Sequence, residues 1–168
     1  MKKNILIVGG SSGIGLALVK QIHSKNNLFV ANRSNEGLNG LPVTYIPYDV
    51  EADELEISIL PETLDGLVYC PGTINLRPFK GLKPEVFFKD FSINVMGAVK
   101  TLQAVLGRLN NCETCASVVF FSTVAVQTGM PFHASVATAK GALEGLSRSL
   151  AAELAPKIRK YRSCRFNS

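Results

Sequence analysis

The chain has 168 residues, of which 46% are hydrophobic and 18% charged, and this is the composition of one folded globular domain rather than of a disordered chain. The formal net charge of +5 arises in residues 157–168, which hold five basic residues and no acidic one, so the rest of the chain is neutral. A neutral body with a basic tail excludes a nucleic-acid-binding face, and the lack of any apolar run near ~20 residues excludes a membrane-spanning segment.

The first 60 residues alternate short apolar runs with segments of helical periodicity. Residues 4–8, NILIV, form the continuous apolar run that a buried parallel strand requires. Residues 14–22 place apolar side chains at helical spacing, whereas residues 28–32 and 43–48 predict a second and a third strand. Residues 52–60, ADELEISIL, are interpreted as a short helix.

The same alternation continues in the rest of the chain. Residues 66–69 predict a fourth strand, and prolines and glycines mark residues 70–83 as a loop. A long helix is expected over residues 84–110, because proline suits its first turn and apolar residues recur at helical spacing. Residues 117–123 predict a fifth strand, and residues 134–154 predict the last helix.

The alternation of strands and helices predicts an α/β fold, a Rossmann-like three-layer αβα sandwich. Right-handed crossovers between successive strands give a parallel sheet of order 3-2-1-4-5. Ligands in such sheets bind at the carboxyl ends of the strands, where the order switches between strands 1 and 4. We therefore look for functional residues at this edge of the sheet.

The segment VGGSSGIG, residues 8–15, joins the first strand to the first helix. Its glycines are spaced to allow a tight turn, a close approach of a phosphate-bearing ligand and close packing of the helix. The helix N-terminus adds free N–H groups and a partial positive charge, which suit a pyrophosphate. Because the loop follows a strand and opens a helix, it favours dinucleotide binding over a plain turn. The expected cofactor contacts here are Gly9, Ser11, Ser12, Gly13, Ile14 and Gly15.

On this glycine spacing the sequence resembles the short-chain dehydrogenase/reductase family, whose motif is TGxxxGxG, with Val8 in the place of its Thr. The resemblance covers residues 4 to about 159. It implies that Asp49 and Val50 stand where the family contacts adenine, and that CPGT at residues 70–73 replaces the family's Asn-Ala-Gly. The further cofactor contacts that the resemblance implies are Asp49, Val50, Pro71, Gly72 and Lys140.

The residues that end the second strand bear on the choice of nicotinamide cofactor. Members that prefer NAD carry an acid here to hold the ribose hydroxyls, whereas this chain has Asn32, Arg33 and Ser34. Arg33 is suited to a charge-assisted contact with a 2′-phosphate, and its alternative role is that of a solvated loop residue. We therefore expect NADP to contact these three residues, with NAD the less favoured cofactor.

The resemblance also implies a catalytic site that lacks one group. In the family a hydride passes between the nicotinamide and a carbonyl carbon, while a tyrosine exchanges the proton and a lysine one turn later lowers the tyrosine pKa. Lys140 matches that lysine, but the tyrosine position is Val136, which cannot exchange a proton. Thr123 aligns with the family's serine, with Ser122 beside it, and Asn94 matches an asparagine of the long helix. The implied catalytic residues are Asn94, Ser122, Thr123 and Lys140.

No other residue restores the proton donor by its spacing. Tyr69 ends the fourth strand near the ligand crevice, but its geometry does not follow from the sequence. His133 has a pKa suited to relaying a proton, although nothing in the sequence orients it. Lys140 keeps the role of holding the nicotinamide ribose, and the alternative is a lysine whose stem merely lies along the start of its helix.

Two functions remain open. The first is an NAD(P)-dependent oxidoreductase acting on a small carbonyl or alcohol, with weak or lost activity because Val136 replaces the tyrosine. The second is a non-catalytic NAD(P)-binding protein that acts by binding or assembly with a partner. A homodimer through the two long helices is expected if their apolar stripes are not buried against the sheet. The identity of the substrate does not follow from the sequence.

The chain stops where the family would continue with further strands. We expect an NAD(P)-binding domain over residues 1–156, truncated after the helix that follows strand five, and a disordered basic tail over residues 157–168. A frameshifted reading of a longer gene would produce such a tail. The sheet would then have an unpaired edge at strand five.

The apolar run at the N-terminus is too short for a signal peptide, so a cytoplasmic protein with reduced cysteines is expected. Cys112 and Cys115 form a lone CxxC pair without the second pair that a metal site of this kind needs, and we expect no metal there.

Overall fold

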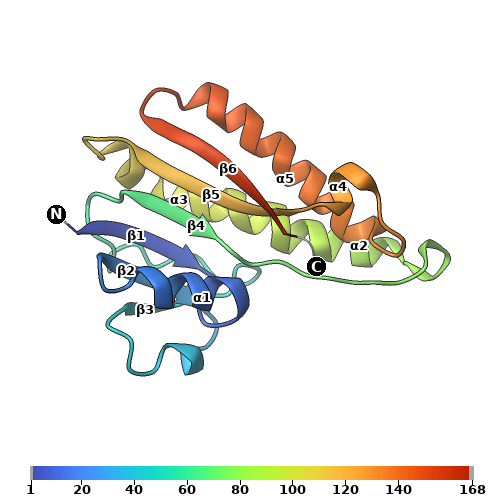
Figure 1. The fold of residues 1–168 in the computed structure, drawn as a ribbon, viewed down its shortest axis with the longest axis horizontal. Coiled ribbons are helices and arrows are strands. Elements are labelled where there is room, and N and C mark those ends of the chain that lie inside the picture. The colour runs from blue at the N-terminus through green and yellow to red at the C-terminus, as the bar shows by residue number, and fades with distance from the viewer. Residues whose placement is uncertain (1, 167–168) are drawn as a thin grey trace.

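The computed structural model describes residues 2–166, with side chains to residue 158. Its sheet has the order β3-β2-β1-β4-β5-β6, and each pair of neighbouring strands is parallel (Figure 1). The strands are β1 (Lys3–Val8), β2 (Asn26–Asn32), β3 (Thr44–Pro47), β4 (Gly66–Tyr69), β5 (Ala116–Thr123) and β6 (Ile158–Phe166). The predicted order 3-2-1-4-5 is therefore confirmed, and β6 extends it.

Helices cover both faces of the sheet (Figure 1). They are α1 (Gly13–Ile22), α2 (Pro84–Phe91), α3 (Gly97–Asn110), α4 (Ala125–Thr128) and α5 (Ala134–Glu153), with short helical turns η1 (Glu36–Leu38), η2 (Phe79–Gly81) and η3 (Ser92–Met96). Among the described residues, no helix has both the length and the apolar character to cross a bilayer.

Two apolar clusters form because alternate side chains of a strand point to opposite faces. In β1, Leu6 packs with Leu102 of α3 and Leu143 of α5 in the larger cluster. The intervening Ile7 packs with Val19 of α1 in the smaller cluster. The sheet is thus buried on both faces, which is why its strands are continuous apolar runs in the sequence.

Residues 52–60 differ from the short helix that the sequence predicted. They form an irregular segment with turns, although Leu55 and Leu60 are buried in the larger cluster. Acidic side chains near this segment accept bonds from nearby backbone N–H groups, including Asp49 from Glu51 at 2.9 Å and Glu56 from Ser58 at 3.0 Å. Such local bonds compete with helical ones, so the apolar spacing alone misled the prediction.

Over residues 158–166 the tail differs from the expectation that residues 157–168 are disordered and that the sheet ends at strand five, and residues 167 and 168 lie outside the described residues. Residues 158–166 form β6, which pairs in parallel with β5. The physical reason is that strand pairing uses backbone groups, which β5 would otherwise leave unpaired at the sheet edge, and it needs no apolar alternation. Ile158 anchors the start of β6, because its side chain is 1% exposed in the larger cluster.

The predicted long helix, residues 84–110, is one helical segment interrupted by the π-helical turn η3 between α2 and α3. Tyr69, at the end of β4, donates a hydrogen bond from its hydroxyl to the carbonyl oxygen of Ile93 in η3, at 2.6 Å. Gly97 follows η3, and a Cβ there would collide with the Tyr69 hydroxyl. A π-helical turn of this kind is frequent at functional sites, and here it contains Asn94.

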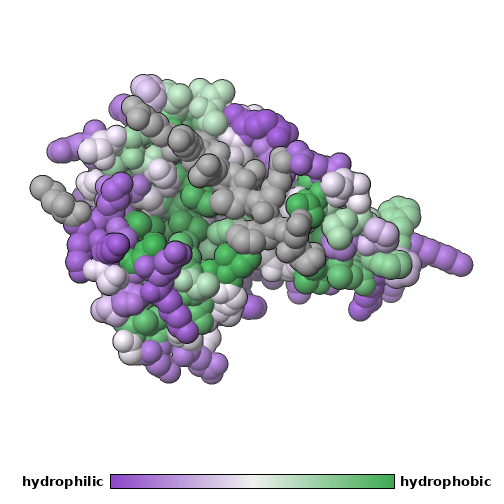
Figure 2. Space-filling view, in the orientation of Figure 1, coloured by the Kyte–Doolittle hydropathy of each residue, from purple (hydrophilic) through white to green (hydrophobic). Residues whose placement is uncertain are grey.

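The apolar stripes of the two long helices are largely used by the protein's own core, since Val95, Leu102 and Leu143 are buried. Other apolar side chains are exposed on and beside α2. Figure 2 shows hydrophobic and hydrophilic residues side by side at the end of the molecule that holds α2. This α2 surface comprises Phe88 and Phe91 of α2 and Phe79, whose ring contacts that of Phe87 in α2. The other exposed apolar side chains between residues 74 and 132 are Ile74, Leu76, Met96, Met130 and Phe132.

Candidate dinucleotide and catalytic site

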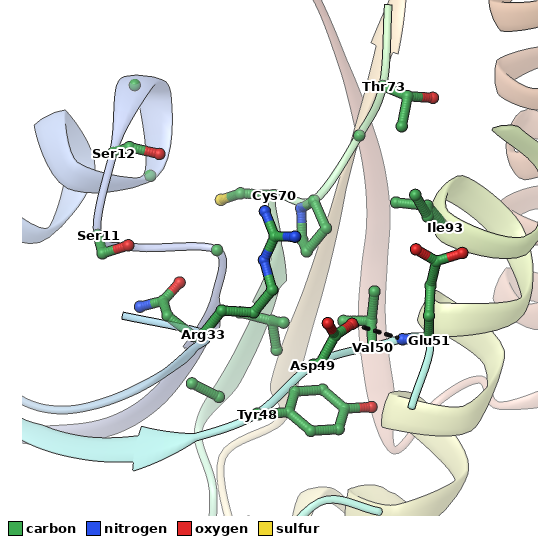
Figure 3. A pocket seen from close by; sticks show the side chains of 18 of the residues that line it. Ser11, Ser12, Arg33, Tyr48, Asp49, Val50, Glu51, Cys70, Thr73 and Ile93 are labelled. Atoms are coloured by element: carbon green, nitrogen blue, oxygen red, sulfur yellow. Dashed lines mark hydrogen bonds between the residues drawn. The ribbon is translucent and has the colours of Figure 1, made fainter. Parts of the chain in front are cut away.

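A cleft of about 570 Å³ lies at the carboxyl ends of β1, β2 and β4 (Figure 3). This is the edge of the sheet where the strand order switches, as the sequence predicted for a ligand site. Every predicted cofactor residue except Lys140 lines it. These lining residues are Gly9, Ser11, Ser12, Gly13, Ile14, Gly15, Asn32, Arg33, Ser34, Asp49, Val50, Pro71 and Gly72.

The glycine loop forms the floor of this cleft at the start of α1. Gly9 and Gly13 have φ angles of 80° and 51°, a region that favours glycine. A Cβ at Gly15 would collide with the carbonyl oxygen of Gly9, whereas a Cβ at Gly13 would meet no atom within 4 Å. Gly15 therefore closes the turn, and Gly13 faces open space at the helix N-terminus.

The end of β2 forms one wall. Asn32 is 6% exposed, and its Nδ2 atom has no hydrogen-bond partner among the described residues. Arg33 is exposed, and Figure 3 shows its guanidinium extending across the cleft toward Cys70. Asp49 lies on the facing wall, where its Oδ1 accepts the backbone N–H of Glu51 at 2.9 Å.

The loop after β4 connects the cleft to the predicted catalytic residues. Gly72 lines the cleft, and a Cβ on it would lie 3.1 Å from Asn94 Oδ1 and 3.2 Å from Lys140 Nζ. Both polar groups thus meet at Gly72, although neither side chain lines the cleft itself. The absence of a side chain at Gly72 is what lets these two groups reach the cleft edge.

Asn94 is held by a buried polar network. Its Nδ2 donates to Thr73 Oγ1 at 3.1 Å and to the Asp90 carbonyl oxygen at 2.8 Å. Thr73 and Asn75 both donate to Asp90 Oδ1. Asn94 Oδ1 is left as a buried acceptor without a partner among the described residues. The network therefore fixes the amide and keeps its oxygen free on the side of Gly72.

Lys140 lies on α5, one turn after Val136, and both side chains are buried, with 8% and 5% exposed. Burial lowers the pKa of Lys140 to about 8, while the neighbouring Cys70 acts weakly in the opposite direction. Burial raises the pKa of Cys70 to about 12, so its thiol stays neutral near pH 7. No carboxylate of the described residues forms an ion pair with Lys140.

The two hydroxyl residues at the end of β5 face opposite sides. Ser122 is buried on the side of the larger cluster and donates to Glu144 Oε1 of α5 at 2.7 Å. Thr123 is half-buried on the other face, where its Oγ1 accepts the backbone N–H of Ala125 at 3.3 Å. Neither residue lines the cleft, and the hydroxyl of Ser122 is committed to α5.

The alternative proton donors lie apart from the cleft. The Tyr69 hydroxyl is bonded to Ile93, its ring is 1% exposed, and burial raises its pKa far above the usual value. His133 is 8% exposed, with Nδ1 bonded to the Pro131 carbonyl oxygen at 2.7 Å. Neither residue lines the cleft, so neither replaces the hydroxyl that Val136 lacks.

Several lining residues were not predicted from the sequence. Lys89 and Ile93 come from successive turns of the long helix, four residues apart, a spacing that places them on one face. Cys70 and Thr73 flank the predicted Pro71 and Gly72, so their position in the same loop was the available signal. The remaining unpredicted lining residues are Val8, Ala31, Tyr48, Glu51 and Phe121.

The sheet order, the helices on both faces and the cleft at the switch point define a Rossmann-like α/β protein. The family model described as short chain dehydrogenase matches residues 3–162, and the chain therefore belongs to this oxidoreductase family. The resemblance stated from the glycine motif is thereby confirmed.

Among curated proteins, the chain is 29% identical over 167 residues to L-xylulose reductase of Bos taurus, covering 94% of this chain and 68% of that protein. It is 30% identical over 164 residues to carbonyl reductase [NADPH] 2 of Sus scrofa, covering 92% and 67%. The chain thus spans about two thirds of the length of these relatives.

Solved structures show the same fold. A short-chain dehydrogenase from Streptomyces avermitilis matches with a TM-score of 0.87 and 25% identity, over 96% of this chain and 64% of that one. A short chain dehydrogenase from Shigella flexneri complexed with NADP matches with a TM-score of 0.85 and 23% identity, over 94% and 74%.

Proposed function

We propose that this chain binds NADP in the cleft and that its oxidoreductase activity on small carbonyl or alcohol compounds is weak or lost. The observation that carries the proposal is the convergence of thirteen sequence-predicted residues on one cleft of about 570 Å³. Ligand sites in proteins typically have volumes of about 300–1,000 Å³. The catalytic part of the proposal rests on Val136, which is buried at the position where the family has its proton donor.

The residues present at the start of α1 fit a pyrophosphate. The backbone at Gly13 faces open space, and no acidic residue stands in the first turn of α1 to repel an anion. Ser11 and Ser12 line the same turn and offer hydroxyl donors. When bound, NADPH supplies the hydride that reduces a carbonyl carbon, and the role of the glycine loop is to hold its diphosphate.

Features of the cleft and of the relatives support NADP over NAD. The end of β2 has no acid to hold a ribose diol, and the guanidinium of Arg33 extends into the cleft (Figure 3). The Nδ2 atom of Asn32 is a buried donor with no partner among the described residues, which suits a ribose or phosphate oxygen. One curated relative is named for NADPH, and one structural neighbour was solved with NADP.

Lys140 and Asn94 support the binding of the nicotinamide ribose rather than proton transfer. Their Nζ and Oδ1 atoms meet beside Gly72, where an amine and an amide oxygen can bond ribose hydroxyls. Among the described residues that line the cleft, Tyr48 alone carries a phenol, and its hydroxyl is hydrogen-bonded with Thr101 Oγ1 at 3.1 Å. With Val136 as the neighbour of Lys140, the position one turn before the amine offers no phenol for general acid catalysis. Loss of such a group usually lowers the rate about 10²–10⁴-fold.

A second candidate function is a non-catalytic NADP-binding protein that assembles with a partner. The observation that favours it is the α2 surface, where Phe79 and Phe88 are each 74% exposed. Apolar surfaces of this kind commonly mark interaction sites. A homodimer through the two long helices stays a separate prediction that holds for either function.

Isothermal titration calorimetry on the purified chain tests the shared premise. We expect NADPH to bind more tightly than NADH. If neither nucleotide binds at millimolar concentration, both candidate functions are wrong.

Turnover of the Val136→Tyr variant separates the two functions. Against a panel of small aldehydes and ketones, we expect NADPH oxidation about 10²–10⁴-fold faster than in the native chain. Val136→Phe is the matched control, because it adds the same ring without the hydroxyl and should stay at the native rate. If the tyrosine variant still binds NADPH but gains no turnover, the non-catalytic function is supported.

A further inference from the structure

Lys140 lacks the tyrosine that stands one helical turn before the lysine in the family. Its Nζ lies 3.2 Å from where a Cβ of Gly72 would stand, and Gly72 lines the cleft. Val136, one turn earlier on α5, presents methyl groups where a hydroxyl would otherwise stand beside the amine. The site therefore places a buried lysine amine beside Gly72, a residue that lines a cleft able to hold a small ligand.

The surroundings of Lys140 favour the neutral amine. It forms no hydrogen bond or ion pair within the part of the chain that the structure describes. Burial lowers its pKa to about 8, and the titratable group that acts on it is the thiol of Cys70, which is itself neutral because burial raises its pKa to about 12. A lysine desolvated in this way is nucleophilic near neutral pH.

We propose that Lys140 is a carbonyl-binding nucleophile that forms a reversible imine with small aldehydes reaching the cleft. The lone pair of Nζ attacks the carbonyl carbon, the C=O π-bond breaks, and a carbinolamine forms. The carbonyl oxygen then leaves as water with the two protons of the amine, and a C=N bond remains. The step involves no oxidation or reduction and therefore requires no further reactant.

The free amide oxygen of Asn94 suits this reaction. It lies beside the same point of Gly72, at 3.1 Å from the position of a Cβ there, and it has no other partner among the described residues. It can accept a hydrogen bond from the N–H or O–H group of the carbinolamine. The Thr73 and Asp90 bonds to the other end of the amide hold this oxygen in place.

The inference takes from the proposed function only that small carbonyl compounds enter the cleft, and it requires no bound NADPH. The experiment treats the native chain with propanal and sodium borohydride, which reduces an imine to a stable propylated lysine, and locates the adducts by peptide mass spectrometry. Lys100 of α3, an exposed lysine, serves as the internal reference. At pH 7.5 we expect Lys140 to be labelled at least about tenfold faster than Lys100, because burial lowers the pKa of Lys140 to about 8 and so leaves more of its amine neutral.

The pH profile and a denatured control complete the test. Labelling of Lys140 should rise with pH and level off above a midpoint near about 8. In urea the preference for Lys140 should disappear. Equal labelling of the two lysines in the folded chain, or no adduct at Lys140, would overturn the proposal.

The proposal of NADPH binding and the proposal of imine formation are tested independently of each other. If NADPH binds beside Lys140 as proposed, saturating NADPH should slow the labelling of Lys140 and leave that of Lys100 unchanged. If NADPH does not bind, labelling is unaffected by the nucleotide, and the imine proposal still stands or falls on the comparison of the two lysines.

Discussion

Gly97 and Tyr69 should be strongly coupled, because the glycine leaves room for the hydroxyl that anchors the π-helical turn. The Tyr69 side chain is 1% exposed, and its hydroxyl bonds to the Ile93 carbonyl oxygen at 2.6 Å. A Cβ at Gly97 would collide with that hydroxyl, and it would also lie 3.1 Å from Val50 Cβ and 3.3 Å from Tyr69 Cζ. The ring cannot rotate away, since it is packed in the core.

The magnitudes follow from these contacts. In the native chain, Gly97→Ala should destabilise the fold by about 1–3 kcal/mol through overpacking and by a further ~1–3 kcal/mol because a buried hydrogen bond is broken. The higher helix propensity of alanine offsets about 1 kcal/mol of this loss. We expect a net loss of about 3 kcal/mol. Tyr69→Phe alone should cost about 1 kcal/mol, and in that background Gly97→Ala should be nearly neutral, because the colliding oxygen is gone.

The native chain, the two single variants and the double variant form a double-mutant cycle. The free energy of unfolding of each is measured by urea unfolding followed by far-ultraviolet circular dichroism. We expect a coupling free energy of about 3 kcal/mol. Gly107→Ala is the matched control: it lies in the same helix with no atom within 4 Å of a Cβ, so it should stabilise the chain by up to about 1 kcal/mol. Effects of the two substitutions that simply add would refute the reasoning. Because Ile93 lines the cleft, Gly97→Ala should also weaken NADPH binding.

Two further outcomes are expected. Arg33→Ala should weaken NADPH binding about 10–100-fold in calorimetry, because a charge-assisted bond contributes about 1.5–3 kcal/mol, and should leave NADH binding nearly unchanged; equal losses for both nucleotides would place the 2′-phosphate elsewhere. Lys140→Met should be more stable than the native chain at neutral pH, because the folded state binds a proton on Lys140 less tightly than the unfolded state does. The free energy of unfolding of the native chain should therefore increase relative to that of the variant by about 3 kcal/mol as the pH rises from about 8 to about 10.4. If urea unfolding gives the same pH dependence for both chains, this reasoning is wrong.

The strands that the sequence predicted range from β4, whose four residues are all buried, to β3, in which only Ile46 is buried. The apolar runs at residues 4–8 and 117–123 became β1 and β5 because a parallel strand covered on both faces needs apolar side chains throughout. The segment at residues 52–60 has apolar spacing as well, yet it forms a loop in which acidic side chains in and beside it accept short-range hydrogen bonds from backbone N–H groups. The periodicity of apolar residues indicates which side chains are buried, but a buried segment need not be helical.

At the site, the sequence predicted which residues line the cleft but not which hydrogen bonds their polar atoms form. The thirteen cleft residues followed from a motif, because a glycine turn between a strand and a helix has few possible geometries. The roles of Ser122 and Asp90 did not follow, since their partners Glu144 and Thr73 lie 22 and 17 residues away in the chain.

The sequence by itself determined the order of the sheet, the glycine turn and the valine at position 136, because each depends on residue type at a fixed local spacing. Only the tertiary structure decided that Gly72 brings Lys140 and Asn94 together, that Tyr69 is tied to η3, and that residues 158–166 pair with β5. These arrangements depend on contacts between segments distant in the chain, where burial and backbone pairing act and local spacing carries no information.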